Sequence, residues 1–376
     1  MDNKKIIIHS AQAGLRLQKF DGSFPAGTNG PWKHKVTQVR NTAHWAYLIY
    51  TAFLISKENK FRNAAIKACD YLLLPKLRPG DATFYCRISP ETKLKSNGLI
   101  GQAWAIEPLI FIGKHEKKQE YLDLAEKILT IHPFNRRKGL YESVDIDGSS
   151  KGINGTLNQQ IWFAAISLYY CKTKGLRKGK LYINAKECLK KITHKIDIYE
   201  DGCIKHSIKK SFKSCLKQYI FKYFKKELSE RNDIIHSYYS QRELSVGYHS
   251  FILAGISMAF NNYPDLQLWK KLMKNKKTQK AIRYSFEAIK NSDKESGFAF
   301  QYNPTGIENA FFWQTFSNCP RANVTQEYFE SAIMHQLNKH YDYDSSLMNK
   351  RTVDPDTLSA RIYELAYLMD LKNYKH

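Results

Sequence analysis

The segment Asp21-Gly22-Ser23-Phe24 decides the fold, because short turns of the same kind return along the chain. Each turn places an aromatic or apolar residue shortly after a glycine, and the later copies lie at 80–84, 139–141, 201–204 and 296–298. The first four glycines are spaced by roughly sixty residues, and the interval before the last is longer. Each interval holds one pair of helices, and self-similarity at a fixed period is typical of repeat architectures. The turns therefore predict a series of helical hairpins.

Between the turns, apolar residues recur every third or fourth position, which is the spacing of one face of an α-helix. The clearest runs are 43–56, 99–112, 121–131, 157–171 and 246–260. No comparable run alternates strictly between apolar and polar residues, as a half-buried strand would. We therefore predict an all-α protein of roughly ten or more helices. Further helices are expected near 6–18, 325–340 and 357–371.

The number of hairpins suggests how they are arranged. About six hairpins fit in the chain, and six hairpins that close on themselves form an (α/α)6 toroid. An open solenoid is the alternative, but these repeats share too little sequence for a tandem array. We expect one toroid domain over residues 1–376, with a basic amphipathic insertion at 205–232 in the longer interval.

The bulk composition is that of a globular protein, with 43% hydrophobic and 13% aromatic residues. The net charge of +24 favours anionic partners, such as an acidic or lipid-linked glycan or an anionic membrane, although a Lys-rich proteome would give the same balance. No recognised nucleic-acid motif appears, so we expect no nucleic-acid partner. The seven cysteines show no CxxC pair, which argues against zinc and disulfides and favours reduced thiols in the cytoplasm. We see no signal peptide and no run of about 18 apolar residues, so we expect a cytoplasmic protein without a membrane span.

The insertion at 205–232 leaves two interpretations open. An apolar stripe with lysines opposite it, which includes Ile208 and Phe212, is typical of a helix lying on the inner face of an anionic membrane. An ordinary toroid helix with a solvated basic face has the same pattern.

Polar and aromatic side chains gather near the starts of the helices expected inside the ring. A convergent set of polar groups among aromatic rings is what a ligand pocket requires. The residues expected to bind substrate are Arg40, Trp45, Asn97, Gln102, Trp104, Glu107, Gln159, Glu308 and Arg361. Helix capping is the alternative for Asn97, and a packing layer is the alternative for Trp45 and Trp104.

Cleaving or rearranging a glycan needs a proton donor together with a base or nucleophile. Glycosidases take both from carboxylates, whereas His and Tyr suit proton transfer near neutral pH. The candidate catalytic residues are Asp21, His44, Asp147, Tyr248 and His249. Asp21 and Asp147 lie in Asp-Gly turns, where ordinary turn chemistry is the alternative. His44 shares a helical face with Arg40, and a satisfied core histidine is the alternative for it. No cofactor or metal motif appears, so we expect no cofactor, while a metal at the acidic turns stays open.

Several long strings resemble one family, whose members occur with bacterial capsule and lipopolysaccharide biosynthesis proteins and with an archaeal N-glycosylation cluster. The strings are DGSFPAGTNGPWKHKVTQVRNTAHW at 21–45, NGLIGQAWAIE at 97–107, HPFNRRKGLYESVDIDGS at 132–149, NQQIWFAA at 158–165 and DPDTLSARIYEL at 354–365. The resemblance implies a six-hairpin glycosidase-like toroid and covers most of the chain except about 205–232. This copy has Thr28 and Gln159 where the family pattern leads us to expect histidines.

Together these features predict an enzyme of surface polysaccharide or lipid-linked glycan biosynthesis, acting on a poly- or oligosaccharide. The expected chemistry is glycosidic-bond cleavage, by a hydrolase or lyase, or uronate modification. A non-catalytic glycan-binding scaffold is one alternative. A terpenoid-type toroid that handles isoprenoid chains is another, and it would need an apolar pit.

Overall fold

The computed structural model describes residues 2–90, 92, 94–208, 230–287, 294, 296–317 and 326–369. Most of the apolar stripe predicted in the insertion at 205–232 lies outside these residues. No helix in the described part of the chain is long and apolar enough to cross a bilayer.

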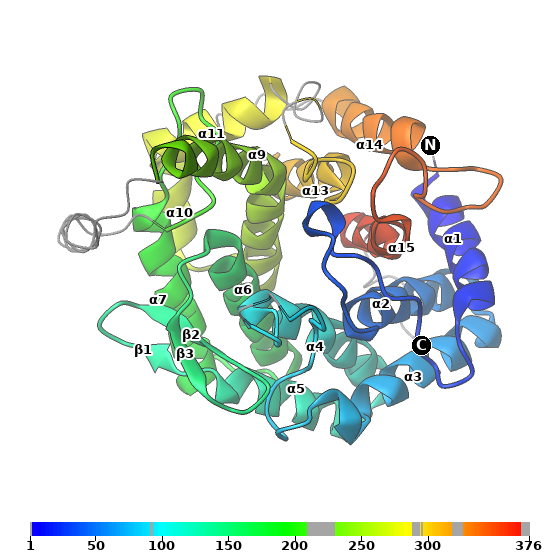
Figure 1. The fold of residues 1–376 in the computed structure, drawn as a ribbon. Coiled ribbons are helices and arrows are strands. Elements are labelled where there is room, and N and C mark those ends of the chain that lie inside the picture. The colour runs from blue at the N-terminus through cyan, green and yellow to red at the C-terminus, as the bar shows by residue number, and fades with distance from the viewer. Residues whose placement is uncertain are drawn as a thin grey trace.

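The described helices form two concentric layers around one axis (Figure 1). The inner layer consists of α2 (Val39–Ser56), α4 (Gly98–Glu116), α6 (Leu157–Thr173), α9 (Glu230–Asn262), α13 (Thr305–Phe316) and α15 (Pro355–Ala360), which continues as the 3-10 helix η3 (Arg361–Leu368). The outer layer consists of α1 (Asn3–Leu17), α3 (Asn59–Leu73), α5 (Gln119–Ile131), α7 (Lys180–Lys195), α10 (Gln267–Lys274), α11 (Lys276–Glu287) and α14 (Gln326–His340).

The inner layer closes on itself. Each inner helix packs against the next in chain order from α2 to α13, and η3 packs against both α13 and α2. At the closure, the N-terminal helix α1 packs against both α2 and η3. This confirms the predicted toroid and rules out the open solenoid.

A small sheet departs from the all-helical prediction. It contains β1 (Phe134–Asn135), β2 (Leu140–Val144) and β3 (Ser150–Ile153), in antiparallel order β1-β2-β3. The sequence analysis did not predict these strands because they are too short for an alternating apolar and polar pattern to be recognised. Two other short elements, η1 (Gly30–Trp32) and η2 (Pro75–Leu77), lie in connections between helices.

The recurring glycines are contact points between neighbouring hairpins. Gly22 has a φ of +91°, and a Cβ built on it would lie 2.3 Å from the carbonyl oxygen of Lys67 in α3. Gly202 has a φ of +103°, and a Cβ built on it would lie 2.5 Å from the carbonyl oxygen of Lys280 in α11. Only glycine allows both this backbone conformation and this approach, so each turn can press against a nearby outer helix.

In four of the five turns, the aromatic or apolar residue two to four positions after the glycine is held by the next inner helix. Its backbone N–H donates to a polar side chain in the first turns of α2, α4 and α6, and in the middle of α9. The pairs are Phe24 to Thr42 (3.0 Å), Phe84 to Gln102 (2.7 Å), Tyr141 to Gln160 (2.9 Å) and Ile204 to His249 (3.1 Å). This shared hydrogen bond is the physical basis of the repeat. It needs only a side chain that has an acceptor atom and is long enough to reach the backbone N–H, so the residue type can vary between hairpins.

Candidate active site

Six charged or titratable side chains from four inner segments lie buried near the axis of the ring, and we call them the axial cluster. Each is at most 6% exposed. The members are Arg40 and His44 of α2, Glu107 of α4, Glu308 of α13, and Arg361 and Glu364 of η3. Burying charge is costly unless it is paired, so such a concentration marks a candidate functional site.

Arg361 connects one half of the axial cluster. Its Nη2 lies 2.7 Å from Glu308 and 2.6 Å from Glu364, and Nη1 donates to Asn303. The guanidinium also lies over the ring of Phe251, 5.1 Å from its centroid. Burial raises the pKa of both glutamates, while the charge of Arg361 acts in the opposite direction. The Oε2 atoms of both glutamates are buried and have no hydrogen-bond partner among the described residues.

Arg40 ties the segment that contains η1 to the inner ring. Its Nη1 donates to Asn29 (3.2 Å) and to the hydroxyl of Tyr302 (2.7 Å), and Nη2 donates to Thr357 (2.7 Å). Asp354, 3.8 Å from Arg40, accepts from the backbone N–H of Gly30 at 2.8 Å. In Figure 1 this segment, in dark blue, runs across the centre of the ring.

His44 is a neutral imidazole with an unused nitrogen. Its ring stacks on Tyr363 at 4.6 Å and meets the edge of Trp104 at 5.5 Å. Burial holds the pKa of His44 well below its ordinary value, and the positive charges of Arg361 and Arg40 lower it further. Nε2 has no hydrogen-bond partner in the described part of the chain. A neutral histidine with a free ring nitrogen can act as a base.

Glu107 fixes the ring on which His44 stacks. The carboxyl oxygens accept from the hydroxyls of Tyr363 (3.2 Å) and Tyr367. Burial raises the pKa of Glu107 to about 8, so the carboxyl is largely protonated near neutral pH. Glu107 therefore holds Tyr363 in place without adding a full negative charge beside His44.

A row of aromatic residues extends from the cluster toward solvent. Tyr248 packs between His206 and Phe298, with ring centroids 4.8 Å and 5.8 Å away. Trp32 packs on Phe298 at 5.2 Å and is 41% exposed. Burial raises the pKa of Tyr248, which keeps its phenol protonated. Aromatic faces exposed at the edge of a polar site suit a ligand with both apolar and hydroxyl surfaces.

The structure brings six of the predicted residues to this site: Arg40, His44, Trp104, Glu107, Glu308 and Arg361. Tyr248 lies in the aromatic row beside them. Asp21 and Asp147 are elsewhere, in exposed turns, where each accepts hydrogen bonds from a serine two residues later. Their contacts are those of the ordinary Asp turn.

The other predicted residues hold the scaffold. Gln102 exchanges hydrogen bonds with the backbone of Phe84 and also donates to Ser96. Gln159 accepts from the backbone N–H of Leu99, at the start of α4. His249 accepts from Ile204 and contacts Ser285 at 2.9 Å, so both its ring nitrogens are engaged away from the axial cluster.

Two more predicted residues have local structural roles. Trp45 is buried, stacks on Phe24 at 5.5 Å and leaves no room for a Cβ on Gly14. Asn97 adopts a left-handed conformation, with a φ of +59°, directly before α4. Its side chain does not cap the helix, in contrast to the capping alternative considered for it.

Glu364, Tyr363, Tyr367 and Tyr302 belong to the site but were not among the predicted site residues. Glu364 lies three residues after Arg361, and Tyr367 lies four residues after Tyr363, so helical spacing could have identified both pairs. Tyr302 lies in a loop and has no such signal. Among the described residues, no three His, Cys, Asp or Glu side chains are grouped as metal ligands would be.

No protein-family model matches the chain. Archaeal glycosylation protein Q of Haloferax volcanii is 30% identical over 384 residues, with 98% of each chain covered.

Solved structures with the same fold include a D-mannose isomerase (TM-score 0.66, 12% identity, covering 98% of this chain and 97% of that one). An unsaturated glucuronyl hydrolase specific for heparin has a TM-score of 0.62 and 12% identity, with 100% and 98% covered. An inactive variant of an α-1,6-mannanase from Salegentibacter, in complex with α-1,6-mannotetrose, has a TM-score of 0.60 and 10% identity, with 98% of each chain covered. At these identities the similarity shows the six-hairpin glycosidase-like fold alone.

Proposed function

The chain belongs to the family of archaeal glycosylation protein Q, and from this we propose that it is an enzyme that modifies a sugar of a surface or lipid-linked glycan at the axial cluster. The name of the relative supports a glycan as substrate. The mannanase bound to mannotetrose illustrates that this fold can accommodate an oligosaccharide. The buried charges near the ring axis support a reaction site there.

One observation carries the choice of chemistry: the neutral imidazole of His44, with Nε2 unpartnered, lies near two guanidinium groups. We propose that Nε2 removes a proton from the carbon next to the carboxylate of a uronate. The electron pair of the C–H bond moves toward the carboxylate, and the positive charges of Arg40 and Arg361 stabilise the resulting dianion.

Two reactions can follow removal of this proton. If a proton returns to the opposite face of the same carbon, the sugar is epimerised, and the protonated phenol of Tyr248 is the candidate donor. If instead the neighbouring C–O bond breaks, the electron pair forms a C=C bond and the imidazolium protonates the departing oxygen. The second outcome is lyase cleavage, and both outcomes need one base and one proton donor rather than a pair of carboxyl groups that flank the scissile bond.

Hydrolysis is less well supported. A glycosidase places two carboxyl groups on either side of the scissile bond. Here Glu308 and Glu364 both bind the same nitrogen of Arg361, an arrangement suited to anchoring that cation. The charges of the axial cluster also argue against an isoprenoid-binding pit, which would be apolar.

Access to the site depends on the segment around η1. His44 is only 1% exposed, and Asn29, which hydrogen-bonds to Arg40, holds this segment near the cluster. We propose that a substrate displaces this segment on entry, which would exclude water from the reacting groups when it returns.

The test uses the purified protein with native surface polysaccharide and lipid-linked oligosaccharides in deuterated water. Wild type, His44→Ala and a control, His9→Ala, are compared by mass spectrometry; His9 is exposed on α1. Deuterium uptake without cleavage identifies epimerisation, and cleavage without added water identifies elimination. Either activity should fall at least about a hundredfold in His44→Ala and persist in the control.

Other outcomes contradict the proposal in different ways. Cleavage with addition of water would show a hydrolase and remove His44 as the carbon base. Glycan binding without any change in mass or deuterium content would favour the non-catalytic scaffold, a role consistent with Thr28 and Gln159 standing where histidines were expected.

A further inference from the structure

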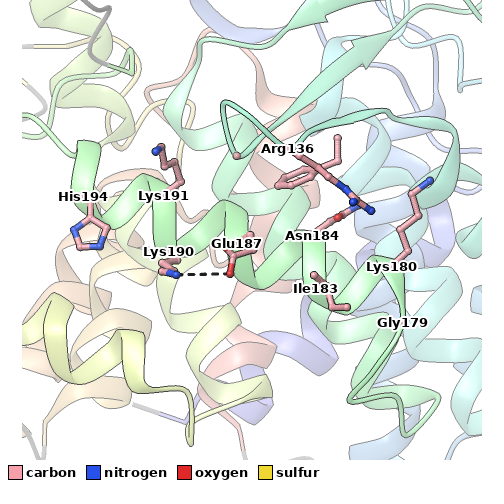
Figure 2. Close-up of a pocket in the computed structure, with 11 residues that line it drawn as sticks. Arg136, Gly179, Lys180, Ile183, Asn184, Glu187, Lys190, Lys191 and His194 are labelled. Atoms are coloured by element: carbon pink, nitrogen blue, oxygen red, sulfur yellow. Dashed lines mark ion pairs between the residues drawn. The ribbon is translucent and has the colours of Figure 1, made fainter.

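A groove lies along the outer helix α7, and we call it the basic groove (Figure 2). Its volume is about 780 Å³, within the range of small-ligand sites. The groove runs between one face of α7 and the β1 region. Its lining from α7 includes residues 180 to 194, so it extends for about 21 Å along that helix.

The groove carries mostly positive charge. Its lining includes Arg136, Lys180, Lys190 and Lys191, and a single acid, Glu187. Glu187 lies 3.8 Å from Lys190, so at most one of the four cations is neutralised within the groove. The other three have no carboxylate partner among the described lining residues.

At the Lys190 and Lys191 end of the groove, further cations lie nearby. Lys195, partly buried next to this face, has its pKa lowered first by burial and then by the charges of Lys191 and Lys138. Like charges this close repel one another, and an anion bound among them would relieve that repulsion.

The remaining lining residues match a sugar better than a simple ion. Phe134 supplies an aromatic ring on the β1 side, and Asn184, only 7% exposed, supplies an amide. Aromatic rings pack against apolar faces, and amides bond hydroxyl groups. A concave groove of this volume also suits a chain-like ligand better than the flat surface of a bilayer.

We propose that the basic groove binds an extended acidic oligosaccharide, outside the axial cluster, as a secondary glycan site. The inference shares with the proposed function only the premise that the protein handles a glycan. The cations would bind the carboxylates of the chain, while Phe134 and Asn184 contact its sugar rings. Such a site would hold a long acidic glycan on the enzyme between reaction events.

The test measures binding of fluorescent hexagalacturonate to the full-length protein. Two double variants reverse charge at opposite ends of the groove: Lys190→Glu with Lys191→Glu, and Arg136→Glu with Lys180→Glu. The matched control is Lys276→Glu with Lys280→Glu, which makes the same charge change on the exposed face of α11, another outer helix. Circular dichroism verifies the fold of each variant.

We expect the dissociation constant to rise at least about tenfold in both groove variants and by less than about threefold in the control. Added salt should weaken binding in the wild type, and a neutral dextran oligosaccharide should not compete. The same comparison made in a His44→Ala background should give the same ratios between groove variants, control and parent, so loss of the proposed reaction would leave this result unchanged.

Three outcomes would overturn the inference. Equal binding by wild type and both groove variants would place the glycan elsewhere. A loss of binding that is as large in the α11 control would show attraction by net charge alone. If the groove variants lose binding to phosphatidylglycerol vesicles or RNA but keep binding to hexagalacturonate, the groove serves a membrane or a nucleic acid instead.

Discussion

The pKa of one carboxyl, that of Glu107, makes stability depend on pH. Burial raises this pKa to about 8 in the folded chain, whereas an exposed glutamate titrates near 4.5. The folded state therefore binds the extra proton between these values, and stability falls as pH rises through this window, by up to about 1.4 kcal/mol per pH unit. Glu107→Gln should remove this contribution. Urea unfolding at pH 6 and pH 8 should show a smaller loss in the variant than in the wild type, and equal losses would contradict the assignment.

Replacing Arg361 measures the free-energy cost of breaking a buried ion pair. Arg361→Met leaves Glu308 and Glu364 buried without their cation, so we expect a loss of about 3–5 kcal/mol in the free energy of unfolding. Arg177 and Asp265 form an exposed pair at 2.6 Å, and Arg177→Met should cost less than about 1 kcal/mol. Chemical denaturation of both variants checks the contrast. Similar losses would mean that Arg361 contributes little beyond a surface pair.

The glycine turns are the element that recurs in successive hairpins, and each turn packs one hairpin against its neighbour. Gly22→Ala adds a Cβ that meets the backbone of Lys67 at 2.3 Å, and backbone atoms cannot move aside cheaply. Gly152 has a similar positive φ of +76° but open space around it, so Gly152→Ala isolates the conformational cost. We expect Gly22→Ala to be less stable than Gly152→Ala by about 1–3 kcal/mol, measured by thermal or urea unfolding. Equal losses would show that the contact with α3 is unimportant.

At the scale of the whole molecule, closure of the ring creates the site. Arg40 and His44 come from the second helix of the chain, whereas Arg361 and Glu364 come from the last described one. They are neighbours only because η3 packs against both α13 and α2. An open array of the same hairpins would separate these groups, so the fold and the axial cluster depend on each other.

The sequence by itself determined the hairpins and their approximate bounds, because helical periodicity and turn glycines are local signals. It favoured a closed ring over an open solenoid, and the packing of η3 against α2 confirmed the closure. It also identified the axial residues Arg40, His44, Glu107, Glu308 and Arg361, since charged groups within apolar helices stand out. Gln102 and His249 stood out for the same reason, although they hold backbone groups of neighbouring turns. Only the tertiary structure separated the two groups. The direction of a side chain, toward the axis or toward a turn, depends on contacts between segments far apart in the chain, and composition and spacing do not record such contacts.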